Sequence, residues 1–246
     1  MKDELEGIII RYQEYREHDA ILHVLCRKRG IVHVNARGIQ KVKSKNAPAC
    51  QLFTHVRMQL PLQETRSIYT LRSAEIIEGY RHIREDLLKQ SIAAYVCECI
   101  DASKFEEDVF EVVQTVLDIL QETTHPMHPI RILCLFQAIM NRMHGIEPYV
   151  DGCVRCGNQK AIYAISIRDG GFICHSCYRM EQDAMRSKED LKVFRLLCKA
   201  HMEHYDILKS YQAFTYQNFE DLYAFFYEYA GISLKSVKFL KTIIAM

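Results

Sequence analysis

The stretch 153–177 reads CVRCGNQKAIYAISIRDGGFICHSC and contains two Cys-x-x-Cys pairs, Cys153/Cys156 and Cys174/Cys177. Seventeen residues separate the inner cysteines, which matches the spacing of a zinc ribbon. Two tight turns that face each other can place four thiolates in a tetrahedral cage. Gly157 follows the first pair, where such a turn often needs a positive φ. We therefore predict one structural Zn²⁺ whose four sulfur ligands leave no open position for activating water.

Other uses of these cysteines fit the sequence less well. Two disulfides remain an alternative, but the six cysteines outside the pairs lie mostly in apolar runs, as buried free thiols of a reducing compartment do. A thioredoxin-like site needs a single pair at a strand-to-helix junction, whereas this chain has two pairs in a loop-like stretch. A zinc deaminase needs Pro-Cys-x-x-Cys after an upstream His-x-Glu, whereas Gly152 precedes Cys153 and the His201–Glu203 motif lies downstream. The six other cysteines are Cys26, Cys50, Cys97, Cys99, Cys134 and Cys198.

Residues on the N-terminal side of this module alternate in the manner of β-strands as far as about residue 78. Short β-branched or alternating runs are separated by polar turns, and Lys28-Arg29-Gly30 is a plausible hairpin turn. Closure of a small sheet removes exposed edges, so we expect a closed five-stranded barrel of the OB-fold type in a domain of residues 1–80. The expected strands are 7–15, 20–27, 31–36, 52–60 and 68–77.

After residue 80 the apolar residues follow helical spacing. We expect a helical domain over 81–246, into which the cysteine module is inserted at about 149–180. The fold class is therefore α+β, with a β-barrel followed by helices and an inserted zinc finger of four cysteines. The expected helices cover about 87–99, 109–120, 130–144, 190–204, 218–230 and 234–245.

The composition is that of an ordinary globular protein. The chain has 246 residues, of which 49% are hydrophobic and 26% are charged. No apolar run approaches twenty residues, and the N-terminus MKDELEGIII does not resemble a secretory signal. We expect a cytoplasmic protein without a membrane span.

Positive charge is concentrated near the N-terminus, although the whole chain carries a net charge of only +1. Residues 1–80 hold 13 Lys and Arg against 9 Asp and Glu, a difference of +4. Residues 27–45 hold seven basic residues and no acid, which can concentrate positive potential on one face. A solvated surface without a ligand is the alternative. The seven are Arg27, Lys28, Arg29, Arg37, Lys41, Lys43 and Lys45.

A small barrel with a basic loop suits nucleic acid, because Lys and Arg neutralise phosphates and aromatic side chains stack on unpaired bases. Tyr12, Tyr15 and Phe53 are candidates for stacking, and each fits the core about as well, Phe53 most of all. No nucleotide-binding or hydrolase motif is found, so the sequence favours binding over catalysis. An acidic cluster of Glu14, Glu17 and Asp19 fits solvated turn residues better than a metal site.

Both ends and the middle of the chain carry features that occur together in a known family. Residues 7–45, GIIIRYQEYREHDAILHVLCRKRGIVHVNARGIQKVKSK, contain an acidic turn at Glu17 and Asp19, a hairpin glycine at Gly30 and a basic loop after Ala36-Arg37-Gly38. The four paired cysteines follow, and residues 231–240 read GISLKSVKFL. In this order the features resemble the RecO family of bacterial recombination mediators and DNA repair proteins.

The resemblance implies an OB-fold and a helical domain with a zinc finger. It also implies a DNA-binding protein, not an enzyme, which anneals complementary strands and binds single- and double-stranded DNA. Its implied partners are RecR and single-stranded-DNA-binding protein, with which it would load RecA at the bacterial nucleoid. An acidic tail of single-stranded-DNA-binding protein would need an apolar groove flanked by cations, and Lys235, Lys238 and Lys241 are spaced for one helix face.

Two other functions remain open at this point. The protein could be an adaptor whose helical domain docks partner proteins, with incidental contact to DNA. It could also be an unrecognised nuclease or glycosylase. Partner binding without DNA affinity would favour the first, and metal-dependent turnover of an oligonucleotide would favour the second.

Overall fold

The computed structural model describes residues 4–27, 29–61, 67–103, 105, 109–211 and 213–245. The chain forms two compact units, one of residues 1–122 with 234–246 and the other of residues 123–233. The expected division into domains 1–80 and 81–246 stays a prediction. In the described part of the chain, no helix is long and apolar enough to cross a membrane.

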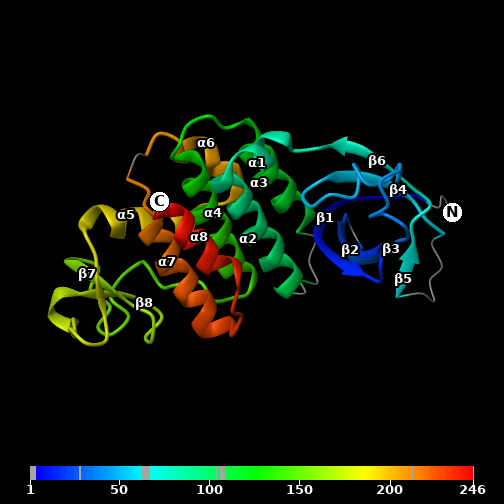
Figure 1. The fold of residues 1–246 in the computed structure, drawn as a ribbon. Coiled ribbons are helices and arrows are strands. Elements are labelled where there is room, and N and C mark those ends of the chain that lie inside the picture. The colour runs from blue at the N-terminus through cyan, green and yellow to red at the C-terminus, as the bar shows by residue number, and fades with distance from the viewer. Residues whose placement is uncertain are drawn as a thin grey trace. The chain divides into compact units, whose positions relative to one another are not determined.

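The first unit contains a six-stranded sheet whose strands curl strongly (Figure 1). Its strand order is β5-β3-β2-β1-β4-β6, and all neighbouring strands are antiparallel except β3 and β5. The strands are β1 (Glu4–Tyr15), β2 (Asp19–Cys26), β3 (Gly30–Ala36), β4 (His55–Gln59), β5 (Ile68–Thr70) and β6 (Ser73–Glu78).

The expected closed barrel of five strands is wrong in strand number and in closure. The stretch expected as one strand, 68–77, divides at Leu71 and Arg72. The Leu71 N–H donates to the Asn35 carbonyl at 3.0 Å, and the Arg72 N–H donates to the Gln59 carbonyl at 2.9 Å. These bonds direct β5 to β3 and β6 to β4, so the two short strands form the opposite edges of an open sheet.

Both faces of the central strand β1 are covered. Ile8 and Ile9 follow one another and are both buried, which an alternating strand allows only when each face has a neighbour. Ile10 is also buried and lies at a register shift between the pairs Ile9–Val24 and Arg11–His23. Helices α2 (Leu87–Ser103) and α3 (Phe110–Glu122) contact β1 on one side, and the sheet's own core fills the other. The consecutive isoleucines therefore form the junction between the sheet and its helices.

The end of the chain returns to this unit as α8 (Ser236–Ile244), which packs against α2. The Glu98 carboxylate on α2 accepts hydrogen bonds from the Lys235 and Ser236 N–H groups, at 3.0 and 2.8 Å. A carboxylate at a helix N-terminus satisfies free donors and complements the helix dipole. Glu98 therefore fixes the start of α8. The short helix α1 (Arg81–Glu85) completes the helices of this unit among the described residues.

The second unit is built around α4 (His128–Met143), which is almost entirely buried. Helices α5 (Lys188–Lys199) and α7 (Tyr216–Phe225) pack against it, and a π-helical turn (Phe226–Ala230) continues α7. The single helix expected over 190–204 ends at Lys199; a 3-10 turn (Met202–His204) and α6 (Tyr205–Leu208) follow. A small sheet of order β8-β7-β9 completes the unit, with strands Gly171–Cys174, Ile162–Ser166 and Ala184–Met185.

We predict that Glu98→Ala lowers the free energy of unfolding by about 1–2 kcal/mol, as the loss of a helix cap does. Glu98→Gln keeps one oxygen acceptor and should lose less. Urea unfolding followed by circular dichroism would measure both changes. Equal stability of wild type and Glu98→Ala would contradict the assigned cap.

Candidate functional site

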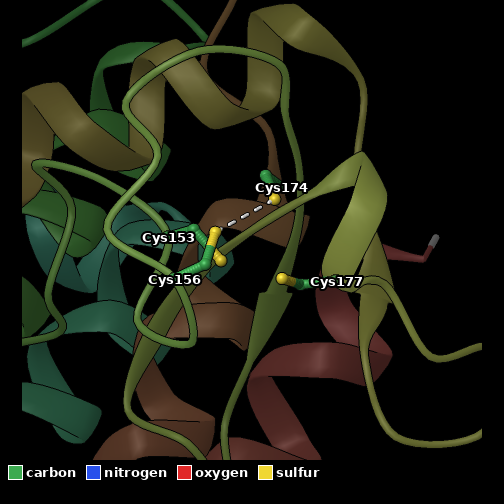
Figure 2. A group of neighbouring side chains, drawn as sticks. All are labelled: Cys153, Cys156, Cys174 and Cys177. Atoms are coloured by element: carbon green, nitrogen blue, oxygen red, sulfur yellow. Dashed lines mark hydrogen bonds between the residues drawn. The ribbon is translucent and has the colours of Figure 1, made fainter.

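The four predicted cysteine ligands come together in the second unit (Figure 2). Their Sγ atoms all lie within 4.8 Å of one another, and the Cys156 and Cys174 sulfurs are 3.7 Å apart. A tetrahedron with zinc–sulfur bonds of about 2.3 Å has sulfur–sulfur edges of about 3.8 Å. The cluster therefore has the size and the donor chemistry of a metal site with four thiolate ligands.

Local backbone geometry forms each half of the cluster. Gly157 has a φ of +74°, as expected, and its N–H donates to the Cys153 carbonyl at 2.8 Å. The second pair continues from β8 into a 3-10 turn, His175–Cys177. The His175 N–H donates to the Ala161 carbonyl at 3.0 Å, which joins the second turn to the start of β7.

The apolar core around the cluster is very small. It contains the buried residues Cys153, Ala164, Ile173 and Cys174, with a few half-buried neighbours. So little apolar surface provides a weak driving force for folding, and small modules of this kind need a cross-link or a metal. The four cysteines are therefore placed to supply a cross-link that the few surrounding apolar side chains do not provide.

Two thiols of this cluster, Cys153 and Cys177, have pKa values shifted in opposite directions. Burial tends to raise the pKa of Cys153, but the backbone N–H groups of Cys174, Arg155 and Cys156 favour its thiolate and lower the pKa to about 6. Hydrogen bonds to Cys156 and Cys174 raise the pKa of Cys177 to about 12. Thiolates this close together repel one another, and a cation among the sulfurs would offset that repulsion.

The other six cysteines are buried and free. Burial raises the pKa of Cys26 and Cys50 to about 12, so neither is a thiolate near neutral pH. Across the described residues, the four paired cysteines are the one group of three or more Cys, His, Asp or Glu side chains arranged to hold a metal ion. Four sulfur donors complete a tetrahedral shell, so this site can hold a metal but leaves no position for a substrate.

The predicted basic residues of 27–45 are not equivalent. The Arg27 guanidinium forms an ion pair with Glu111 on α3 and lies 4.7 Å from the centre of the Phe110 ring. A phosphate would have to compete with Glu111 for this side chain. Lys28 lies outside the described residues.

The remaining five basic residues are exposed, and none forms an ion pair with another described residue. Three of them lie close together in the turn-rich segment that follows β3. The Ser44 N–H donates to the Lys41 carbonyl at 2.9 Å, so a tight turn presents these lysines to solvent. The five are Arg29, Arg37, Lys41, Lys43 and Lys45.

The basic segment, residues 37–45, is anchored to the sheet by hydrogen bonds and by buried side chains. Asp19 accepts a hydrogen bond from the Gly38 N–H at 2.7 Å, and the His18 carbonyl accepts one from the Gln40 N–H at 3.1 Å. Ile39 and Cys50 are buried in the core of the sheet. Asp19, one of the three acids of the predicted acidic cluster, therefore has a structural role in holding the basic segment.

The three candidates for base stacking lie in different environments. Phe53 is 3% exposed and belongs to the core. Tyr12 packs partly against the sheet core, whereas Tyr15 is 40% exposed and has the Arg16 guanidinium 5.1 Å from its ring centre. Tyr15 is thus the most accessible of the three.

A groove on α5 was not predicted from the sequence. It has a volume of about 380 Å³, and its lining includes the apolar Val193 and Leu196 and the cations Lys192, Arg195 and Lys199. The i, i+3 and i+7 spacing of the three cations is visible in the sequence, but the groove also needs Tyr211 and Ala213 from a distant stretch.

The lysines expected to bind a partner lie at or on α8. Lys235, Lys238 and Lys241 are all exposed, and Lys235 borders a second groove, of about 490 Å³, between β1 and α2. That groove contains two cations, Arg11 and Lys235, and two acids, Glu98 and Asp101. Its charge is therefore balanced, unlike that of the α5 groove.

Comparison with known proteins shows the same family along nearly the whole chain. The family models "Recombination protein O N terminal" and "Recombination protein O C terminal" match residues 1–80 and 84–238. The DNA repair protein RecO of Bacillus subtilis is 33% identical over 251 residues, which cover 98% of this chain and 94% of that protein. That of Bacillus pumilus is 32% identical over 250 residues, with the same two coverages.

A further relative, the DNA repair protein RecO of Listeria monocytogenes serotype 4b, is 29% identical over 244 residues, which cover 97% of this chain and 94% of that protein. The matches include the strands, the basic segment, the paired cysteines and the start of α8. The resemblance noted in the sequence is thus confirmed, and the chain belongs to the RecO family of DNA repair proteins.

Proposed function

We propose that this protein binds DNA, anneals complementary strands and helps to load RecA onto DNA coated by single-stranded-DNA-binding protein, together with RecR. The observation that carries the proposal is the anchored basic segment, whose cations have no acidic partner among the described residues. Unpaired cations on an anchored segment suit a polyanion, because binding releases counterions from the phosphates without breaking internal ion pairs.

Annealing requires two phosphate backbones to approach each other. Lys41, Lys43 and Lys45 would contact phosphates of both strands and reduce their mutual repulsion. Arg29 and Arg37 would extend the same surface, and Arg27 would contribute at its margin. Lys28 is a further expected phosphate contact and lies outside the described residues. Contacts of this type are independent of sequence, which suits a protein that must act wherever DNA is damaged.

We infer that the cysteine cluster holds one Zn²⁺. Thiolate donors in a tetrahedral arrangement favour zinc, and the ion would supply a cross-link that the small core lacks. Cys153 and Cys156 would bind from one turn, and Cys174 and Cys177 from the other. The bound metal would stabilise the module and would take no part in a reaction.

The α5 groove supports a second proposal, that the acidic tail of single-stranded-DNA-binding protein docks there. The tail needs apolar contacts flanked by cations, and this groove has three cations and one acid, Glu189. Arg195 and Lys199 both bind Asp151, at 2.9 and 2.7 Å, whereas Lys192 forms no ion pair with a described residue. The α8 lysines are the competing placement.

We predict that changing Lys41, Lys43 and Lys45 together to Ala weakens binding of single-stranded DNA for all sequences alike. Loss of three phosphate contacts should make the slope of log K against log salt shallower by about two. Fluorescence anisotropy at several salt concentrations would measure the slope, and a strand-annealing assay would show a slower rate.

The matched control changes Lys160, Lys188 and Lys238 to Ala, which removes the same charge elsewhere and should leave the slope close to that of wild type. Identical slopes for both variants and wild type would refute the basic segment as the DNA surface. Strong partner binding without DNA affinity would favour the adaptor, and cleavage of the oligonucleotide would favour an enzyme.

We predict one zinc per chain by metal analysis of the purified protein. A Cys153→Ser/Cys174→Ser variant should lose the metal and misfold or aggregate, because ligation contributes folding free energy. A Cys26→Ala/Cys198→Ala variant removes two thiols outside the cluster and should keep the metal. A folded, metal-free wild type with two disulfides would overturn the assignment.

We predict that Lys192→Glu weakens binding of a labelled acidic tail peptide by about fivefold to tenfold. Exposed ion pairs contribute roughly 0.2–1 kcal/mol, and charge reversal replaces attraction by repulsion. Lys238→Glu, with the same charge change on α8, should have little effect. Fluorescence anisotropy would distinguish them; the opposite order of effects would place the tail on α8.

A further inference from the structure

Arg155 lies between the two cysteines of the first pair, and its guanidinium reaches the part of the chain that carries the second pair. Its Nη1 donates to the backbone carbonyl of Cys177 at 2.6 Å. The same side chain forms a two-bond fork with Asp183, at 2.6 and 2.7 Å. Its Nε donates to Asp169 at 2.8 Å. One side chain thus joins both halves of the cluster through groups that are not metal ligands.

The network is well shielded from water. The Arg155 side chain is 14% exposed and the Asp183 side chain is fully buried. Charged hydrogen bonds are short and directional in such surroundings, and a buried carboxylate that lost its partner would be costly. Arg155 is therefore fixed in this conformation by its carboxylate partners, independently of any metal.

Each acceptor is itself tied to a different piece of the module. Asp183 also accepts a hydrogen bond from the Arg179 N–H at 2.7 Å, which shapes the loop after the second pair. Asp169 lies in the turn between β7 and β8 and accepts a hydrogen bond from the Ser166 hydroxyl at 3.2 Å. Through these two acids, Arg155 connects the first cysteine turn, the strand turn and the loop that follows Cys177.

We propose that Arg155 is a positioning residue: it holds the chain around the four sulfurs in the arrangement that binds the metal. This inference rests on the proposed metal site. A metal that binds to a disordered set of ligands must order them, and side chains that hold ligands in place reduce this cost. Loss of such a group lowers metal affinity by about 10- to 100-fold while the ligands themselves remain. The Arg155 side chain acts through the Cys177 carbonyl, and the hydrogen bond of this residue to the Cys153 sulfur comes from its backbone N–H, which a side-chain substitution keeps.

A second, largely buried Arg–Asp pair in the same unit provides a control for loss of stability without loss of metal affinity. Arg186 forms an equivalent two-bond fork with Asp221, at 2.8 and 2.6 Å, in the same unit. Its side chain is 20% exposed, and its partner is 6% exposed. No hydrogen bond joins Arg186 to the four cysteines among the described residues. Loss of this second fork should therefore cost stability without a specific effect on the metal.

The experiment measures Zn²⁺ affinity by competition with a chromophoric chelator for the full-length wild type, Arg155→Gln and Arg186→Gln. We expect Arg155→Gln to bind Zn²⁺ about 10- to 100-fold more weakly and Arg186→Gln to bind as wild type does. Co²⁺ loading of Arg155→Gln should still give the thiolate charge-transfer bands of wild type, which would show an unchanged ligand set.

Arg155→Lys provides a second measurement if Arg155→Gln does not fold. Lysine keeps the charge toward Asp183 but cannot reach Asp169, Asp183 and the Cys177 carbonyl at once, so an intermediate affinity is expected. Wild-type affinity in either Arg155 variant, or equal losses in the Arg155 and Arg186 variants, would overturn the inference. A wild type that binds no Zn²⁺ would instead overturn the proposed metal site itself.

Discussion

The proposed DNA surface depends on keeping positive charges close together without neutralising them. Lys41, Lys43 and Lys45 repel one another, and a free loop would separate them. Buried contacts of Ile39 and Cys50 and the bond from Gly38 to Asp19 hold the base of this segment against that repulsion. The Asp19 carboxylate that anchors the segment accepts the Gly38 N–H and forms no ion pair with these lysines in the described part of the chain, so their charge remains available to a polyanion.

In the cysteine module, by contrast, like charges that lie close together would be neutralised by a cation. The thiols of this module lie close enough to repel one another once ionised, and a cation among them would convert this repulsion into a bond network. The surrounding chain already contains one such arrangement, in which the single cation Arg155 is shared by two acids and a carbonyl. The Arg155 network holds a module with a small core in one shape by pairing unlike charges at short range, and a cation among the thiolates would act in the same way.

Features that depend on local spacing were predictable from the sequence. The four cysteines lie in one short stretch, Gly157 has the expected positive φ, and the apolar periodicity of α2, α3 and α4 locates these helices. Features that depend on distant partners were not predictable. The division of 68–77 requires acceptors on β3 and β4, the neutralisation of Arg27 requires Glu111, and the α5 groove requires Tyr211. No periodicity within a segment contains this information.

The C-terminal motif GISLKSVKFL contains both buried residues that stabilise the fold and exposed lysines that the sequence offered as a partner site. Leu234 and Leu240 are buried, and the backbone between them begins α8 under the Glu98 carboxylate. These residues account for the motif as a structural element of the first unit. Lys235 and Lys238 are exposed to solvent and are not needed for this packing. Because Glu98 accepts two N–H groups at the start of the helix, its charge also lies close to Lys235. An acidic ligand at that position would meet this carboxylate, which is the physical reason to prefer the α5 groove for an acidic tail.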